Sequence, residues 1–259
     1  MSGDAIVTNV PAGPAPAAIA ASTSSVFVAE GEPDTGPPGQ PRTQVLERLD
    51  TTSLAVERSV AAPSVVDVAV TPGLVWTVTS SGLVVAYDDT VLAKRWSLQL
   101  DGRGRASVSA DSNHVWAAIG SIDNAGSGHY VVGRIDAVTG VAMEPIAVPG
   151  DGVGPTIIAG APAWLAIADD PIHDRLYAMN LDGSLRDVGS ISAPAGMSRN
   201  DQTVLSLGVD GSITIFDASS GEVITSGAAH SSGAAVAVSG DAAYVAIGDQ
   251  VDVVEPPQR

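Results

Sequence analysis

The sequence contains no cysteine and only ten aromatic residues among its 259 positions. A chain without cysteine forms no disulfide, zinc ribbon or iron–sulfur cluster, and it has no thiol nucleophile. Any metal ion would therefore need oxygen or histidine ligands. The same absence leaves the redox compartment of the protein open.

Basic residues are also scarce, with 12 lysines and arginines against 29 acidic residues and a formal net charge of −17. Because nucleic acids and anionic membranes are bound by clustered basic side chains, we expect neither as a partner. No apolar run approaches the roughly 20 residues of a membrane span, so we expect no direct membrane insertion. The first residues lack the basic patch and apolar core of a signal peptide, which leaves a cytoplasmic protein and an excised extracellular domain as alternatives.

A short apolar strand pattern recurs six times along the chain, at intervals of 39 to 49 residues. Its copies are Val26–Ala29, Val75–Val78, Val115–Ala118, Ala163–Ala166, Val204–Leu207 and Ala243–Ala246. Each copy follows an alternating apolar stretch and a turn, which is typical of a strand hairpin. A third strand, a turn and a more polar fourth strand come next. Four antiparallel strands at this period form one blade of a β-propeller.

The sequence therefore predicts an all-β fold, a six-bladed β-propeller of four-stranded antiparallel blades that forms a single domain over residues 1–259. The predicted blades span residues 16–62, 64–100, 105–148, 155–192, 195–228 and 234–255. The last blade contains only three strand-length segments. We expect residues 5–10, an isolated apolar strand, to complete it and close the ring, which would hide two sheet edges.

Two segments resemble known propeller repeats. Residues Val238–Ala246 look like the first hairpin of a YVTN repeat, and Ala86–Trp96 is similar to the eleven-residue docking motif of quinoprotein blades. The chain resembles the bacterial propeller families built from YVTN, NHL or quinoprotein-like (PQQ-like) repeats, and this resemblance implies a fold and not an activity. Val91 and Leu92 replace the Thr-Gly pair of the quinoprotein motif, and the paired cysteines of many quinoprotein dehydrogenases are absent. We therefore expect no PQQ cofactor.

Five aromatic side chains take equivalent places in the second strands of the repeats: Phe27, Trp76, Trp116, Trp164 and Tyr244. Equivalent places in successive blades favour packing between blades over an aromatic ligand-binding box. Third strands often end in an aspartate, at Asp50, Asp88, Asp136 and Asp217. We interpret the carboxylates of Asp88, Asp136 and Asp217 as acceptors of backbone N–H bonds in the turns that follow.

A candidate site follows from loop length. Loops that join second to third strands, and each blade to the next, emerge on one face of a propeller. Residues 30–42, 121–129 and 169–174 form long loops there, and binding residues concentrate on such loops. The predicted ligand-binding residues are Glu30, Glu32, Asp123, Asp169, Asp170, Arg103 and Arg105, with Asp174 in the same acidic group. The candidates for acid–base catalysis are His129, His173 and His230.

Three classes of function remain open. The first is a non-enzymatic binding module for a protein, peptide or glycan, as a monomer and as a sensor or interaction domain of a larger cell-surface protein. The second is a lyase or hydrolase similar to streptogramin lyases, in which the three histidines and Glu30 would act with a divalent cation on one face. The third is a structural assembly domain. The chain has no His-Glu-x-x-His, phosphate-binding or nucleophile-elbow motif, which favours the binding module.

Overall fold

The computed structural model describes residues 16–30, 44–122, 128–150, 154–169, 172–228, 235–239, 242–247 and 250–254. These residues form β-strands, turns and bends, and they contain no helix. None of them belongs to a helix that is long and apolar enough to cross a membrane. The all-β prediction is therefore confirmed for this part of the chain.

The strands pair antiparallel and in chain order within six separate sheets. The first two sheets hold β1 (Pro16–Ala21), β2 (Ser25–Glu30), β3 (Val45–Asp50) and β4 (Val56–Ala61), then β5 (Val65–Thr71), β6 (Leu74–Thr79), β7 (Leu83–Asp88) and β8 (Lys94–Gln99). The third and fourth hold β9 (Ala106–Ala110), β10 (His114–Ile122), β11 (Gly128–Asp136) and β12 (Ile146–Pro149), then β13 (Thr156–Ile158), β14 (Ala163–Ala168), β15 (His173–Met179) and β16 (Leu185–Ser192). The last two hold β17 (Pro194–Arg199), β18 (Thr203–Gly208), β19 (Ser212–Asp217) and β20 (Val223–Ala228), then β21 (Ala235–Ser239), β22 (Ala242–Ile247) and β23 (Gln250–Val254).

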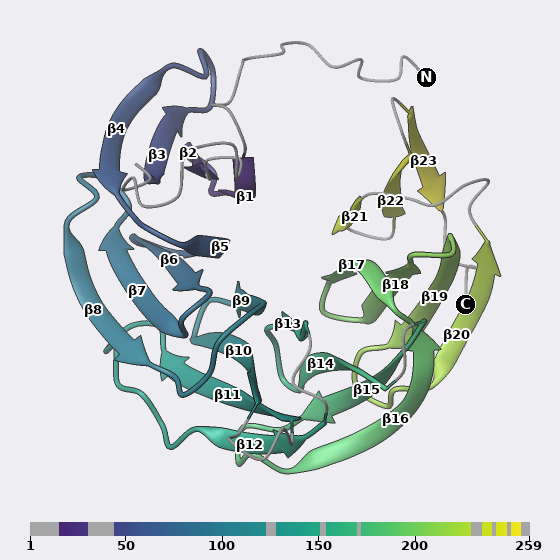
Figure 1. The fold of residues 1–259 in the computed structure, drawn as a ribbon. Coiled ribbons are helices and arrows are strands. Elements are labelled where there is room, and N and C mark those ends of the chain that lie inside the picture. Colours follow the sequence, from purple (N-terminus) through teal and green to yellow (C-terminus); the bar gives the residue numbers. More distant parts are fainter. Residues whose placement is uncertain are drawn as a thin grey trace, which may run out of the picture.

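The sheets follow one another around an arc, with the first strand of each sheet innermost (Figure 1). Contacts between these innermost strands run from β1 to β5, β9, β13, β17 and β21 in turn. Each sheet therefore packs face to face against the next, and the polar fourth strands β4, β8, β16 and β20 lie on the outside (Figure 1).

The prediction of six four-stranded blades is wrong for the described residues. Five sheets have four strands, whereas the sixth, β21–β23, has three, and the described strands do not close a ring. The reason is that this last repeat supplies only three strand-length segments, so a fourth strand has to come from elsewhere. Residues 5–10, the strand that we expected to complete the sheet, lie outside the described residues.

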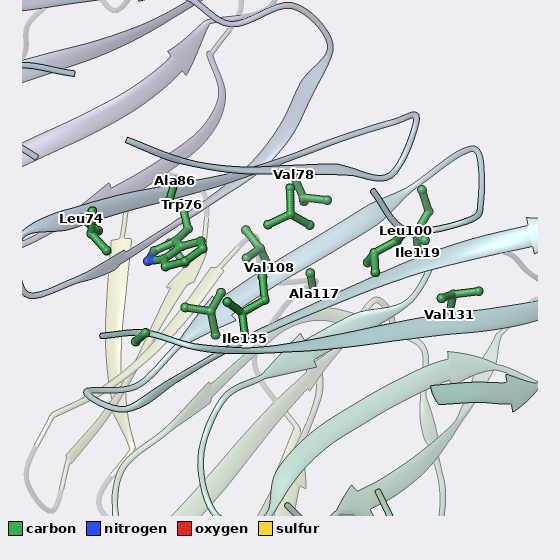
Figure 2. Packing of buried hydrophobic residues seen from close by; sticks show 14 residues of the cluster. Leu74, Trp76, Val78, Ala86, Leu100, Val108, Ala117, Ile119, Val131 and Ile135 are labelled. Atoms are coloured by element: carbon green, nitrogen blue, oxygen red, sulfur yellow. The ribbon is translucent and has the colours of Figure 1, made fainter. Parts of the chain in front are cut away.

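The core lies between the sheets because both faces of the second strands β6, β10, β14 and β18 are covered. Every residue of β6 is buried, and Figure 2 shows how Trp76 and Val78 pack with Val108 and Ile119 from the third sheet. The four aromatic side chains of the second strands that the structure describes are at most 1% exposed: Phe27, Trp76, Trp116 and Trp164. Their predicted role in blade packing is confirmed, while the side chain of Tyr244 lies outside the described residues.

Side chains on the innermost strands also tie neighbouring sheets together. The Asp67 carboxylate on β5 accepts hydrogen bonds from the Val108 amide at 2.8 Å and the Ser107 hydroxyl at 3.1 Å, both on β9. The Ser109 hydroxyl accepts one from the amide of Ala159, just after β13, at 3.0 Å. Burial raises the pKa of Asp67, and these hydrogen bonds partly offset that effect.

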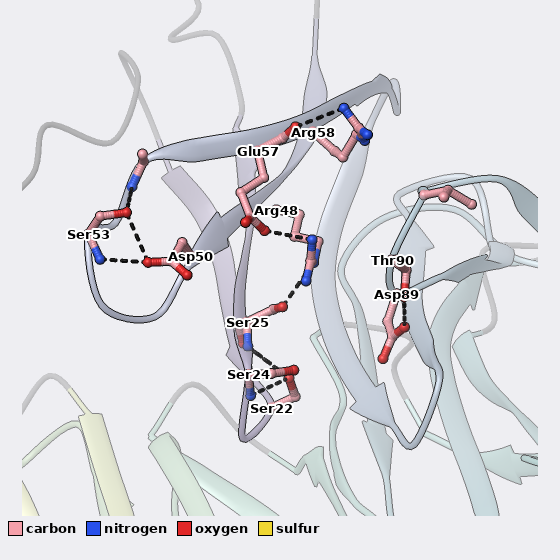
Figure 3. A network of polar contacts seen from close by, with 12 residues as sticks. Ser22, Ser24, Ser25, Arg48, Asp50, Ser53, Glu57, Arg58, Asp89 and Thr90 are labelled. Atoms are coloured by element: carbon pink, nitrogen blue, oxygen red, sulfur yellow. Dashed lines mark hydrogen bonds and ion pairs between the residues drawn. The ribbon is translucent and has the colours of Figure 1, made fainter.

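The aspartates that end the third strands organise the turns as predicted. The Asp50 carboxylate accepts the backbone N–H group of Ser53 at 2.7 Å (Figure 3). It also accepts that of Thr52 at 3.0 Å, and the amide of Leu54 donates to the Asp50 carbonyl at 2.8 Å. The same three bonds recur after Asp88, Asp136 and Asp217. These turns are therefore one local structure repeated in four sheets.

The fifth residue of this turn has a left-handed backbone, which glycine tolerates best. Gly140 and Gly221 occupy it in the third and fifth sheets, but Leu54 and Leu92 occupy it in the first and second, both with φ of 54°. We expect Leu54→Gly to raise the free energy of unfolding by about 0.5–1 kcal/mol, because strain relief exceeds the added flexibility of the unfolded chain. Urea denaturation measures the change.

Leu92→Gly is the matched control for that prediction. Leu92 has the same φ as Leu54 but is only 3% exposed and belongs to a core cluster, whereas Leu54 is half-buried. Removing a buried leucine side chain costs about 2–5 kcal/mol, so Leu92→Gly should destabilise the protein. A loss of stability in Leu54→Gly as large as in Leu92→Gly would contradict the strain argument.

Candidate functional site

The structure describes five of the predicted site residues. Arg103 and Arg105 lie between β8 and β9, His129 is in β11, Asp169 follows β14, and His173 begins β15. Glu32, Asp123, Asp170 and His230, together with the side chain of Glu30, lie outside the described residues.

These five residues lie at the predicted end of the sheets. The Arg103 amide donates to the carbonyl of Gly120, near the end of β10, and the Gly104 amide donates to Ser80, in the turn between β6 and β7. The connection between the second and third sheets therefore lies beside the turns that join second to third strands. We call this end of the sheets the predicted face.

Of the predicted residues, Asp169 and His173 come together across one turn, because the Asp169 amide donates to the His173 carbonyl at 3.0 Å. Both residues are exposed, and His129 is half-buried. No group of three or more His, Asp or Glu side chains that could hold a metal ion occurs among the described residues. Asp174, which we placed in the acidic group of the predicted site, is only 5% exposed, because it lies within β15 between the flanking strands β14 and β16.

A pocket of about 410 Å³ lies at the opposite end of the second and third sheets. Its walls come from the turn between β5 and β6, from Trp96 in β8, from Ser112 between β9 and β10, and from Val138 after β11. Loop length did not indicate this pocket, because the segments around it are short. The resemblance to the quinoprotein docking motif was the only sequence signal there, since that motif ends at Trp96.

Trp96 forms the contact between the two sheets beside this pocket. Its ring stacks on Trp76 with centroids 6.0 Å apart and an angle of 22° between the planes. It also packs on Gly140 of the third sheet, where an added Cβ would lie only 2.4 Å from the Trp96 ring. The φ of +69° thus favours glycine at position 140, and the tryptophan packed on it leaves no room for a Cβ.

Different side chains make the same contact at other sheet interfaces. Ile146 packs near Gly183, where an added Cβ would lie 3.0 Å from it. The Arg186 guanidinium approaches Gly221 and donates hydrogen bonds to the carbonyls of Ser219, at 3.1 Å, and Ser220. Only the second sheet uses tryptophan here among the described residues, so the docking position is structural and tolerates several residue types.

Charge at the pocket is confined to an ion pair. The Arg95 Nη2 atom lies 2.7 Å from Oδ2 of Asp88, and the other oxygen of Asp88 accepts the amides of Thr90 and Val91. The Arg95 guanidinium, followed by these amides, lowers the pKa of Asp88 to about 2. Asp88 is therefore ionised and engaged at neutral pH, which does not suit a general base.

The low pKa of Asp88 predicts a pH dependence. A carboxyl group whose pKa falls from 3.8 to about 2 on folding stabilises the protein above pH 4 and loses this effect as the pH falls toward 2. We expect the difference in free energy of unfolding between the protein and Asp88→Asn to shrink over this interval. Urea denaturation at several pH values tests it, with Asp89→Asn as control. A difference that stays constant from pH 5 to 2 would contradict it.

Exposed apolar side chains occur on the wall of the pocket and close in sequence to residues that line it. Val138, which lines it, is 73% exposed, and Val141 and Met143 in the same turn are 62% and 50% exposed. Val91, in the equivalent turn of the second sheet, is 54% exposed. We call the pocket and these four side chains the apolar face. Apolar side chains gathered in this way mark interaction surfaces more often than isolated ones do.

The chain matches solved structures along most of its length, although no protein-family model and no curated protein matches it. U3-55K aligns with a TM-score of 0.68 and 9% identity over 93% of this chain and 77% of its own. KlAtg21, solved with the coiled coil of AgAtg16, aligns with a TM-score of 0.66 and 17% identity over 91% and 78%. BamB from Moraxella catarrhalis aligns with a TM-score of 0.52 and 14% identity over 92% and 83%.

The fold is a β-propeller. The matched structures include the WD40 repeats of RRP9, with a TM-score of 0.68 and 10% identity. At these identities the likeness concerns the fold alone, because propellers host many unrelated functions. The YVTN, NHL or quinoprotein-like subtype of the repeats stays a prediction.

Proposed function

We propose that this chain is a non-enzymatic, protein-binding propeller domain whose partner seats an apolar side chain in the pocket between the second and third sheets. The observation that carries the proposal is the pocket of about 410 Å³ with Val138 on its wall and further exposed apolar side chains beside it. This volume lies in the range of about 300–1,000 Å³ that binding pockets have.

A protein fits this surface better than a small molecule does. A ligand confined to the pocket would leave Val141 and Met143 in water, since neither lines it. A partner that covers the turn would remove both from water, which supplies binding energy in proportion to the area buried. The carboxylate of the pocket is held in an ion pair with Arg95, which favours recognition over acid–base catalysis.

Two of the similar structures are complexes with other proteins, which supports a protein partner by analogy. KlAtg21 is bound to a coiled coil of AgAtg16. The other is a nidogen/laminin complex, with a TM-score of 0.57 and 10% identity over 82% of this chain. A glycan ligand, a cell-surface location and a site at the predicted face around Asp169 and His173 are separate proposals, which rest on the sequence.

Paired charge substitutions test the apolar face. Proteins retained by the immobilised full chain would be identified by mass spectrometry, and the Kd of each would be measured. We expect the double variant Val138→Asp/Val141→Asp to weaken binding at least about tenfold, because carboxylates would be forced into an apolar contact. The control is Ile172→Asp/Val209→Asp, which adds the same charge to residues 61% and 50% exposed at the other end of the sheets. Loss of binding in the control alone would refute the proposed face.

We further infer that the ring has six blades and that residues 5–10 pair with β23 as the fourth strand of the last sheet. The support is the three-stranded sheet β21–β23, whose last strand has a free edge among the described strands. Removal of residues 1–10 should then lower the Tm, whereas removal of residues 256–259 should not. An unchanged Tm after the first truncation would overturn this closure.

A further inference from the structure

Among the described residues, two nitrogen atoms of a buried cation at the interface between the third and fourth sheets have no hydrogen-bond partner. Arg134, on β11, is only 6% exposed, and its Nε and Nη1 atoms are buried without an acceptor. Its third nitrogen, Nη2, is not one of the buried atoms that lack a partner. Burying a charged group without hydrogen bonds is unfavourable, and such groups therefore mark places where an acceptor is expected.

Trp116 lies at the same interface, and its indole nitrogen is also buried without a hydrogen-bond acceptor. It lies directly opposite Arg134 in the pairing of β10 with β11, and the Arg134 Cζ atom is 5.7 Å from the centre of its ring. Stacking on the indole offsets part of the cost of burying the guanidinium. The indole Nε1 of Trp116 is also buried without an acceptor, whereas that of Trp76 donates to the Thr71 hydroxyl at 3.0 Å.

The first sheet shows what an arginine at this position uses as a partner. Arg48 lies opposite Phe27, as Arg134 lies opposite Trp116. Figure 3 shows that Arg48 donates through Nε to the Ser25 hydroxyl, at 2.9 Å, and forms an ion pair of 2.6 Å with Glu57. No carboxylate among the described residues forms the equivalent ion pair with Arg134, although the two arginines occupy equivalent places.

The charge of Asp182 acts on Arg134, and one oxygen of its carboxylate, Oδ1, is used within its own turn. The carboxylate of Asp182 accepts the amide and the hydroxyl of Ser184 at 2.9 and 2.7 Å. These two bonds, and to a smaller extent the charge of Arg134, lower the pKa of Asp182. Asp182 forms no hydrogen bond with Nε or Nη1 of Arg134, so it contributes long-range attraction to these atoms.

We propose that Arg134 is the ion-pairing group of a carboxylate-binding site between the third and fourth sheets, with Trp116 as its stacking partner. A carboxylate suits this place because its two oxygens match the fork of a guanidinium. The carboxylate can belong to a small organic acid or to an acidic side chain of the bound protein.

If the carboxylate belongs to a protein partner, that partner would contact both this site and the apolar face. The Met143 amide, in the exposed apolar turn, donates to the carbonyl of Arg134 at 2.9 Å. A partner lying on that turn could therefore bring an acidic side chain to Arg134. Binding of an acidic side chain from a protein partner rests on the proposed function. Binding of a free organic acid does not depend on it.

The four tryptophans of the chain allow a direct test by 15N–1H correlation spectroscopy, because each indole N–H gives one signal. The full chain would be titrated with acetate, with glutarate and with the peptide acetyl-Gly-Glu-Gly-amide, against sodium chloride at equal ionic strength. We expect a saturable shift of the Trp116 indole signal with carboxylates and not with chloride. The indole of Trp164, buried without an acceptor but opposite Ala178 instead of arginine, should not shift and is the matched control.

Arg134→Gln should abolish the shift or weaken the apparent affinity at least tenfold, while unchanged signals from Trp76 and Trp164 report an intact fold. If that variant does not fold, Arg134→Lys serves instead, since lysine keeps the charge but not the fork, and a weaker shift is expected. A shift with acetate or glutarate indicates a free acid as ligand, and a shift with the peptide alone indicates an acidic side chain.

Two results would overturn the proposal. One is the absence of a saturable Trp116 shift with all three carboxylates, and the other is a shift that persists unchanged in Arg134→Gln. The test of the apolar face is separate from this one. If Val138→Asp/Val141→Asp no longer binds the protein partner but still shows the Trp116 shift with acetate, the carboxylate site is supported and only partner binding has been lost. Conversely, an unresponsive Trp116 with a partner still bound would leave the proposed function intact.

Discussion

Gly140→Ala is expected to lower the free energy of unfolding by about 2–4 kcal/mol, the sum of left-handed backbone strain and overpacking. The residue has a φ of +69°, and a Cβ added there would lie 2.4 Å from the Trp96 ring. Trp96 cannot move away freely because its other face stacks on the buried Trp76. Urea denaturation gives the change directly.

Gly73→Ala separates the two causes of this loss. Gly73 has a φ of +82°, but an added Cβ would meet no atom within 4 Å. Its substitution should therefore cost only the backbone strain, about 1–2 kcal/mol. In addition, Gly140→Ala should cost less in a Trp96→Ala background than alone. Equal losses at the two glycines would show that the tryptophan contact contributes nothing.

Trp76→Ala is the second substitution with a large expected effect, a loss of about 3–5 kcal/mol. Trp76 is 1% exposed and lies in the cluster between the second and third sheets that Figure 2 shows. Its removal would leave a cavity and would take away the surface on which Trp96 stacks. Because Trp96 also lines the pocket, we expect weaker partner binding in this variant as well.

Trp76→Phe tests how much of that loss comes from the polar atom. Phenylalanine keeps an aromatic ring in the cluster but cannot donate to Thr71, whose hydroxyl accepts the indole N–H at 3.0 Å. The lost hydrogen bond adds about 1 kcal/mol to the cost of the smaller ring. Thr71→Val should remove the same bond. A Trp76→Ala variant as stable as Trp76→Phe would contradict the packing argument.

The apolar face and the carboxylate site have a common structural origin. Both lie where the turns at one end of neighbouring sheets meet, and both depend on the residue that faces the next sheet. Ala86 leaves room for Trp96 to stack on Trp76, whereas Arg134 at the equivalent place covers Trp116. A change of side chain at one repeated position therefore produces a different surface at each interface.

Much of the fold could be predicted from the sequence because its signals act over a few residues. Alternating apolar residues predicted the second strands, and an aspartate followed by small polar residues predicted the turns after Asp50, Asp88 and Asp136. Equivalent places in successive repeats also predicted that Trp76 and Trp116 are buried. Each of these inferences needs only the local backbone or a comparison between repeats.

The candidate site could not be predicted in the same way. Loop length directed attention to the predicted face, but the pocket lies at the other end of the sheets, among short turns. Its existence depends on the volume left between two packed sheets after Trp96 has docked on Gly140, a residue far from it in the sequence. Leftover volume is a property of side chains from different repeats and has no local sequence pattern.

The sequence by itself determined the class of fold, the strands, the turns and the aromatic core, since alternation and turn chemistry are encoded within each repeat. Only the tertiary structure decided where the surface is hollow, which apolar side chains remain exposed, and that no carboxylate among the described residues pairs with Arg134 as Glu57 does with Arg48. The physical reason is that burial and hydrogen-bond satisfaction depend on what the next sheet brings into contact.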